Sequence, residues 1–180
     1  MNQKTLRIVL TGSPSSGKTT LINHIGDMGY RCFPEISRDI IQTSIENNLD
    51  ITPWQNLAAF SNMVWQRREE QFVQANPGWN FYDRSLIDIV AYEELNDCNI
   101  NERWEEQMLI MRYDLVFIAR PWPDIFVNDE QRREDWAQSL RVDEALINAY
   151  RKRGYHPIAL PEVSVEERAD FVVKHIKQHL

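Results

Sequence analysis

Cysteine and glycine are scarce in this sequence, and it has no long hydrophobic run. Its 180 residues include 2 Cys and 6 Gly, and two cysteines (Cys32 and Cys98) are too few for a disulfide framework or a cysteine-based metal site. No apolar run approaches the ~18 residues that a membrane helix needs, and residues 1–4 lead into a strand pattern without an apolar signal segment. We therefore expect no membrane span and a cytoplasmic location.

Positive charge is also in short supply. The 20 Lys and Arg are outnumbered by 27 Asp and Glu, which gives a net charge of −7. Neutralising the phosphates of a nucleic acid needs clustered Lys and Arg, so no nucleic-acid partner is expected. Of the 4 histidines only His175 and His179 share a helical spacing, and without a third ligand they do not predict a transition-metal site.

The remaining composition suits one folded domain. Hydrophobic residues make up 43% of the chain and no repeat or linker interrupts it, so we expect a single domain spanning residues 1–180. Strand patterns alternate with helical patterns, which predicts an α/β fold: five strands in a mainly parallel sheet, with helices on both faces. The expected strands are Arg7–Thr11, Tyr30–Phe33, Trp79–Tyr82, Leu115–Ala119 and one around His156–Leu160. The expected helices include 37–46, 54–72, 102–111 and 165–180, the last starting at a capping box of Ser164 and Glu167.

The most specific motif follows the first expected strand. Its sequence, Gly12-Ser13-Pro14-Ser15-Ser16-Gly17-Lys18-Thr19-Thr20, matches G-x-x-x-x-G-K-[ST] and lies between a strand and a helix, as this phosphate-binding loop requires. Gly12 and Gly17 allow the backbone to surround phosphates, and Lys18 would reach the β- and γ-phosphates. Thr19 would bind Mg²⁺ through its hydroxyl. We expect a nucleoside triphosphate, ATP or alternatively GTP, rather than a glycine-rich turn that matches by chance.

Three classes of protein with this loop compete. A GTPase switch would need an Asn-Lys-x-Asp motif, and the sequence has none. A hydrolytic motor usually places Glu beside the Asp that binds magnesium, whereas Asp83 is followed by Arg84. A small-molecule kinase fits better, since it must hold an acceptor hydroxyl, neutralise the migrating phosphoryl group and exclude water.

Two strand ends supply candidate catalytic groups. Glu35 follows the second expected strand and Asp83 closes the third, and in a doubly wound sheet both ends meet in one crevice beside the loop. We assign Glu35 as general base or clamp for the acceptor hydroxyl, and Asp83 as a second Mg²⁺ ligand beside Thr19. Arg84 and Arg38 would hold the acceptor or the transferred phosphate. The structural alternatives are that Glu35 pairs with Arg38 in a first helical turn and that Asp83 caps the helix after it.

A polar segment at about 120–135 follows the fourth strand and predicts a lid. It holds Arg120, Arg132 and Arg133, and arginines from a lid would cover the phosphates and stabilise transition-state charge. Among them we favour Arg132 as the catalytic arginine. Several carboxylates lie in the same stretch, so a solvated, self-paired loop is the alternative interpretation.

Other residues near the expected site are less specific. Trp54, Phe60 and Trp65 fall where a kinase would seat its acceptor and could stack on a planar ring, but their spacing favours a helix that faces the core. By fold analogy alone, residues 160–164 could border the base of the triphosphate.

Further segments complete a family pattern. They are Ile8–Thr20, Phe33–Arg38, Phe81–Arg84, Tyr113–Ala119 with Pro121-Trp122, Asn128–Arg133, Gly154-Tyr155, Leu160-Pro161 and Ser164–Arg168. In these segments the chain resembles the small AAA-type P-loop ATPases classed with the ribosylnicotinamide-kinase domain of NadR and an animal TRPL-translocation-defect protein. The resemblance implies a P-loop NTPase fold of the nucleoside- or nucleotide-kinase type, a three-layer α/β/α sandwich, with nucleotide binding and Mg²⁺. Relatives often have a second Gly in the loop, where this chain has Ser13-Pro14-Ser15.

The leading hypothesis is an ATP-dependent and Mg²⁺-dependent phosphotransferase acting on a small hydroxyl-bearing acceptor such as a nucleoside or nucleotide. An alternative from another class is a nucleotide-gated regulatory module that binds ATP or GTP and hydrolyses it slowly. A small acceptor that accelerates ADP release would distinguish the two. The sequence identifies neither the acceptor nor the oligomeric state.

Overall fold

The computed structural model describes residues 4–126 and 135–179. Five parallel strands form one sheet in the order β2-β3-β1-β4-β5 within these ranges. The strands are β1 (Thr5–Gly12), β2 (Arg31–Phe33), β3 (Gly78–Asp83), β4 (Leu115–Ala119) and β5 (Ile158–Ala159). The predicted α/β fold with a parallel five-stranded sheet is therefore confirmed, and the all-parallel arrangement brings every strand's carboxyl end to one edge.

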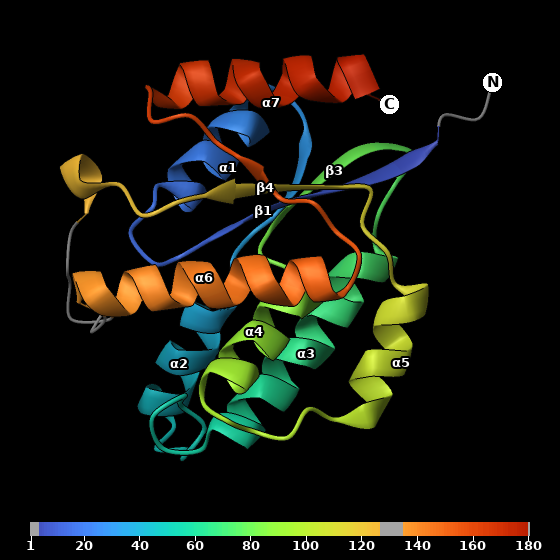
Figure 1. The fold of residues 1–180 in the computed structure, drawn as a ribbon. Coiled ribbons are helices and arrows are strands. Elements are labelled where there is room, and N and C mark those ends of the chain that lie inside the picture. The colour runs from blue at the N-terminus through green and yellow to red at the C-terminus, as the bar shows by residue number, and fades with distance from the viewer. Residues whose placement is uncertain (1–3, 127–134, 180) are drawn as a thin grey trace.

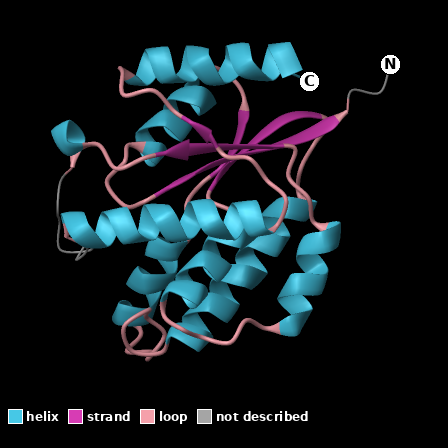
Figure 2. Cartoon of the chain, viewed as in Figure 1, coloured by secondary structure: helices cyan, strands magenta, loops and turns pink. Residues whose placement is uncertain are grey.

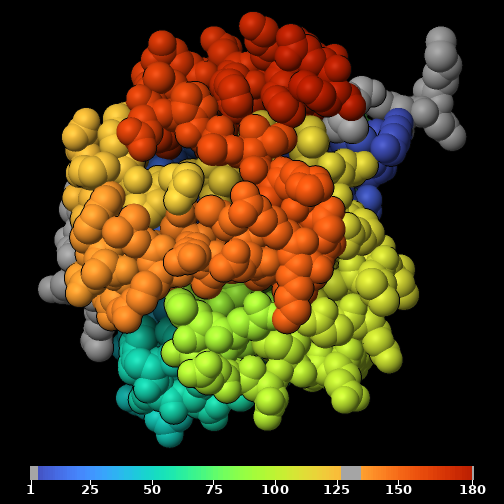
Figure 3. Space-filling model, viewed as in Figure 1, coloured from blue at the N-terminus to red at the C-terminus, as the bar shows by residue number. Residues whose placement is uncertain are grey.

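Helices cover both faces of this sheet (Figures 1 and 2). One face carries α1 (Lys18–Asp27) and α7 (Val165–His179), which pack against each other. The other face carries α2 (Ser37–Glu46), α3 (Leu57–Val73), α4 (Leu86–Leu95), α5 (Glu102–Ile110) and α6 (Trp136–Lys152). A short 3₁₀ turn, η1 (Pro123–Ile125), follows β4 and lies between α6 and α7 at one side of the molecule (Figure 3).

Two apolar cores result from the alternation of side chains along the strands. In β1, Ile8 and Leu10 belong to the core beneath α1 and α7, whereas Val9 belongs to the core on the α3–α6 side. Each of these three side chains is 0% exposed, as expected for a central strand buried on both faces.

Local signals define several helix ends. The Ser164–Glu167 capping box at the start of α7 is confirmed, with Glu167 N donating to Ser164 Oγ at 3.2 Å and Ser164 N donating to Glu167 Oε2 at 3.1 Å. The predicted helix over 54–72 instead begins at Leu57, because the Asn56 side chain accepts a hydrogen bond from Ala59 N and caps it.

The prediction that the aromatic residues face the core is right for Trp65 and wrong for Trp54. Trp65 is 3% exposed and stacks on Trp104 with ring centroids 4.6 Å apart, which confirms its place in the core. Trp54 is 50% exposed and precedes the helix, so the core interpretation was wrong for this residue.

Among the helices of residues 4–126 and 135–179, none combines the length and the apolar character needed to cross a membrane.

Replacing Phe117 with Ala tests the core beneath α7. Phe117 is 0% exposed in β4, and its ring meets Phe171 edge to face with centroids 6.3 Å apart. The resulting cavity should lower the free energy of unfolding by about 3–5 kcal/mol in urea denaturation. Leu109→Ala, at a side chain that is 76% exposed, is the control and should change it by less than about 0.5 kcal/mol. Equal losses in the two variants would contradict the burial pattern.

Candidate active site

The phosphate-binding loop connects β1 to α1 at the carboxyl edge of the sheet. Gly12 has a φ of +141°, and a Cβ placed there would lie 2.1 Å from the Ala119 carbonyl oxygen of the neighbouring strand. Gly17 precedes α1 with a φ of +81°. Neither position accepts a side chain without strain, so the two glycines of the motif are required by the geometry.

Ser15 has a backbone conformation that usually favours glycine. Its φ of 60° is left-handed, a conformation that costs a non-glycine residue about 1 kcal/mol or more. Such strain persists only where the surroundings hold it, and it is typical of functional loops.

Lys18 lies folded against its own loop. Its Nζ donates to Ser13 O at 2.5 Å and to Ser16 Oγ at 3.1 Å, and the residue is 6% exposed. Burial, reinforced by the positive charge of Arg84, lowers the pKa of Lys18 to about 7. The amine is thus an enclosed group beside the loop, where a phosphate oxygen would replace its present acceptors.

Thr19 and Asp83 meet across the same edge. The Thr19 hydroxyl donates to Asp83 Oδ2 at 3.1 Å, and Asp83 Oδ1 is buried without a hydrogen-bond partner among the described residues. Burial raises the pKa of Asp83, against the lowering effect of Lys18 and Arg84. A hydroxyl and a carboxylate with a free, buried oxygen are the hard oxygen donors that Mg²⁺ prefers, so these residues fit the ion. Because Ser85, not Asp83, caps α4, the capping alternative for Asp83 is wrong.

Arg84 bridges the loop and the start of α4. Its Nη1 donates to Gly12 O at 3.1 Å and lies 3.4 Å from Asp88 Oδ1. Its own φ is +72°, which the side-chain contacts hold in place. The guanidinium is therefore fixed within reach of any phosphate in the loop.

Glu35 lies beside the same group of charges. Its Oε1 accepts a hydrogen bond from Ser37 N at 2.7 Å and is 4.0 Å from Arg68 Nη2, while its Oε2 is 3.9 Å from Arg38 Nε. Burial alone would raise the pKa of Glu35, but Arg84, Arg68 and the bond from Ser37 together lower it. The carboxylate is thus held in its ionised form, which accepts hydrogen bonds. The predicted pairing with Arg38 is present as this one long contact, but Glu35 precedes α2 instead of lying in its first turn. The catalytic role of Glu35 stays a prediction.

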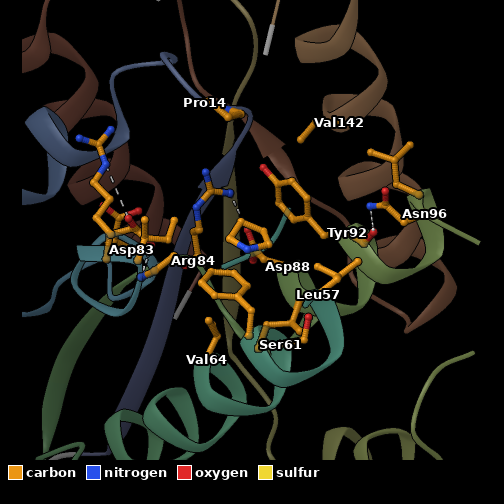
Figure 4. A pocket seen from close by; sticks show the side chains of 18 of the residues that line it. Pro14, Leu57, Ser61, Val64, Asp83, Arg84, Asp88, Tyr92, Asn96 and Val142 are labelled. Carbon is orange, nitrogen blue, oxygen red and sulfur yellow. Dashed lines mark hydrogen bonds and ion pairs between the residues drawn. The ribbon is translucent and has the colours of Figure 1, made fainter. Parts of the chain in front are cut away.

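A cavity of about 720 Å³ brings these groups together. Figure 4 shows Arg84 and Asp88 within it, above Leu57, Ser61 and Val64 of α3. The predicted residues that line it are Pro14, Ser15, Lys18, Thr19, Glu35, Arg38, Trp54, Phe60, Asp83 and Arg84. The expected convergence of the two strand ends and the loop is present.

A second cavity of about 390 Å³ lies on the other side of the loop. It shares Ser15, Lys18 and Thr19 with the first cavity and continues between Trp122 and residues 163–165. The predicted border at residues 160–164 is met in part, by Val163 and Ser164. An aromatic ring and two valines could hold a planar base.

The predicted lid lies largely outside the described residues. Arg132 and Arg133 fall there, so the structure does not place the favoured lid arginine. Arg120, at the start of the segment, pairs with Asp143 of α6 through Nε at 2.9 Å and Nη2 at 2.7 Å. This ion pair attaches the start of the segment to α6.

Four charged residues that line the two cavities were not predicted: Arg68, Asp88, Arg141 and Arg168. Arg68, 2% exposed, donates to Asp83 O at 2.8 Å, and Arg168, 4% exposed, donates to Ser16 O at 3.0 Å. Asp88 lines the larger cavity and accepts a hydrogen bond from Thr11 Oγ1 at 2.6 Å. An arginine on an apolar helical stripe, four positions after Val64, is the one signal that could have indicated Arg68.

Comparison with known proteins identifies the family of this chain. A family model described as an AAA domain (AAA_28) matches residues 7–168. A dephospho-CoA kinase of Rickettsia prowazekii (strain Madrid E) is 26% identical over 175 residues, which cover 93% of this chain and 87% of the relative.

Solved structures share the fold. A deoxyadenosine kinase from M. mycoides superposes with a TM-score of 0.70 at 14% identity, covering 96% of this chain and all of that one (100%). The NadR protein in complex with NR gives a TM-score of 0.66 at 17% identity, covering 97% of this chain and 51% of that one. At these identities the likeness establishes the P-loop kinase fold.

Replacing Lys18 with Met tests the burial of its amine. The pKa is about 7 in the native protein and near 10.5 when exposed, so between these values the unfolded chain binds more protons. The contribution of Lys18 to the free energy of unfolding therefore rises from pH 7 to pH 10.5. In urea denaturation without added nucleotide, the free energy of unfolding of the wild type should increase relative to that of Lys18→Met as the pH rises across this window. A difference that does not change with pH would contradict the assignment.

Proposed function

Since this chain belongs to the AAA_28 family of AAA domains, we propose that it is a P-loop kinase that transfers the γ-phosphoryl group of ATP, with Mg²⁺, to a hydroxyl of a nucleoside- or nucleotide-like acceptor. GTP is the alternative donor. The relatives named above, kinases of dephospho-CoA and deoxyadenosine, support this class of reaction.

One observation carries the proposal: two cavities meet at the same phosphate loop. The smaller has the size and the apolar walls for a nucleotide base, and the larger holds the carboxylates. Their shared residues, Ser15, Lys18 and Thr19, would surround the phosphates at the junction. A phosphotransferase needs a donor site and an acceptor site on either side of the γ-phosphate, whereas a hydrolytic switch needs only the first.

The loop would hold the donor. Its backbone amides and Lys18 would bind the β- and γ-phosphates, and the anionic oxygens that replace the carbonyl of Ser13 would favour the charged form of the amine. Thr19 and Asp83 would hold Mg²⁺, which supplies charge neutralisation at the phosphate oxygens.

Glu35 would act on the acceptor. Its ionised carboxylate would accept a hydrogen bond from the acceptor hydroxyl and take the proton as the new O–P bond forms, while the bond between the γ-phosphorus and the β–γ bridging oxygen of ATP breaks and ADP leaves. Arg84, fixed by Gly12 O and Asp88, would stabilise negative charge on the transferred group. Arg68 would keep Glu35 and the end of β3 in register through its contacts to both. A lid arginine, with Arg132 favoured, would complete the charge stabilisation.

Release of ADP or GDP is the direct test. Protein, Mg²⁺ and either triphosphate are incubated alone and with dephospho-CoA, deoxyadenosine, NR, further nucleosides and nucleotides. Strong stimulation by one compound, with a phosphorylated product found by mass spectrometry, is the expected result. A slow rate that no compound changes, together with tight triphosphate binding, would instead favour the nucleotide-gated regulatory module.

Lys18→Ala should abolish transfer while the fold is retained. Removing the amine leaves the phosphates without their point charge, and kcat/KM should fall by at least about 10²-fold. Circular dichroism checks the fold, and Lys174→Ala on the exposed side of α7 is the matched control. Unchanged ADP production by Lys18→Ala would overturn the assignment of the loop.

Glu35→Gln should separate binding from transfer. The amide keeps the shape but cannot take a proton, so kcat should fall by about 10²–10⁴-fold while the Kd for a non-hydrolysable ATP analogue changes by less than about twofold. Glu70→Gln, at an exposed position of α3, is the control and should retain the wild-type rate. Equal turnover in Glu35→Gln and wild type would remove Glu35 from the mechanism.

A further inference from the structure

The larger cavity is cationic although the protein is acidic. The chain as a whole carries a net charge of −7, yet the cavity is lined by more basic than acidic side chains. The basic ones are Lys18, Arg38, Arg68, Arg84 and Arg141, and the acidic ones are Glu35, Asp83 and Asp88. Local positive charge inside a concave surface concentrates anions there.

Three of the five basic side chains already have defined partners. Lys18 lies in the phosphate loop, and Arg84 is held by Gly12 O and Asp88. Arg68 is buried against Asp83 O and Glu35. Their positions account for the donor phosphates and the transferred group, and they leave Arg38 and Arg141 to be explained.

Arg38 and Arg141 have few contacts of their own. The Arg38 side chain is 45% exposed, and its one ion contact among the described residues is the 3.9 Å approach to Glu35. Arg141 is exposed on α6 and forms no ion pair or hydrogen bond with any residue that the structure describes. They come from α2 and α6, helices about 100 positions apart, and line one cavity.

The start of α2 also lies at this cavity. Arg38 is the second residue of this helix, and Ser37 also lines the cavity. No side chain caps α2 from its N-cap residue Ile36, but the Glu35 carboxylate accepts a hydrogen bond from Ser37 N at 2.7 Å and offsets the positive end of the helix dipole, so the guanidinium of Arg38 is the main positive charge here.

An apolar wall lies in the same cavity. Trp54, Leu57 and Phe60 line it together with Ile41 and Pro53. Trp54 is 50% exposed, and an aromatic side chain in a cavity wall suits a planar group. A ligand that fits this cavity thus combines a planar ring, a hydroxyl that reaches Glu35 and a negatively charged group.

We propose that the acceptor carries a phosphate in addition to its reacting hydroxyl and its planar ring, and that Arg38 and Arg141 bind this phosphate. The inference rests on the proposed function in taking the larger cavity as the acceptor site. It assigns the acceptor to the phosphorylated, nucleotide-like compounds and excludes neutral nucleosides as preferred substrates. Arginine forms paired, charge-assisted hydrogen bonds with phosphate oxygens, which gives both residues a partner of matching geometry.

Paired titrations test this assignment. The protein is first saturated with Mg²⁺ and a non-hydrolysable ATP analogue, which occupies the phosphate loop, and is then titrated by calorimetry with nucleosides and with their 3′- and 5′-monophosphates. For at least one base, a monophosphate should bind about tenfold or more tightly than its nucleoside. The preference should decrease as the salt concentration rises.

Variants locate the phosphate. Arg38→Gln and Arg141→Gln should each reduce the preference for the monophosphate several-fold, and the double variant should remove it while nucleoside binding stays the same. Arg67→Gln, an equal change of charge on the exposed side of α3 outside the cavity, should keep it. Equal affinities for nucleoside and monophosphate, a preference unchanged in the double variant, or no monophosphate binding at millimolar concentration would each overturn the inference.

The binding and transfer experiments test the phosphate site and the kinase proposal separately. If nucleosides bind and are phosphorylated as well as any nucleotide, the kinase proposal holds and the phosphate site is wrong. If monophosphates bind through Arg38 and Arg141 but no compound in the panel is phosphorylated, the phosphate site holds and the kinase proposal is wrong.

Discussion

A single buried carboxylate, that of Asp88, connects the elements around the site. It is 2% exposed and accepts hydrogen bonds from Thr11 Oγ1 of β1 at 2.6 Å, from Ser85 N at 2.9 Å and from Tyr150 OH of α6 at 2.6 Å. A buried charge that loses a partner costs several kcal/mol, so these elements are constrained to one arrangement. Burial and the Asp88 charge raise the pKa of Tyr150 well above its usual value, which keeps the phenol a donor. Asp88 therefore holds together the central strand β1, the cap of α4 and helix α6.

The phosphate loop is supported in a comparable way. Lys18, Arg84 and Arg168 donate to the carbonyl oxygens of Ser13, Gly12 and Ser16, respectively. They come from the start of α1, the junction of β3 with α4, and α7. Because the cations reach the loop from three directions, its shape depends on tertiary packing as well as on its glycines. Such preorganisation reduces the reorganisation needed when charge develops on a transferred group.

The sequence predicted the parts of the site that depend on short local sequence patterns. The loop motif, the order Asp83-Arg84 after a strand and the Ser164–Glu167 cap each depend on residues within a few positions of one another, and the resemblance of the chain to its family follows the same segments. Local pattern offers no signal for Arg168 and only an apolar stripe for Arg68, because the acceptors of both are backbone carbonyls, 152 and 15 positions away. Any residue type supplies a carbonyl, so such a bond leaves no mark in the sequence. Trp54 and Trp65 were predicted to lie in one helix. In the structure Asn56 caps that helix between them, so that Trp54 lies in the cavity wall and Trp65 in the core.

The bond from Arg168 to Ser16 also has a consequence for how the protein is made. Ser16 leaves the ribosome early, but the guanidinium that holds its carbonyl follows 152 positions later and also contacts Pro161 O and the face of Trp122. At about 5–20 residues per second, synthesis of that interval takes roughly 8–30 seconds. During translation the nascent chain would thus present an incompletely supported loop, and nucleotide affinity would arise late, when α7 docks beside α1.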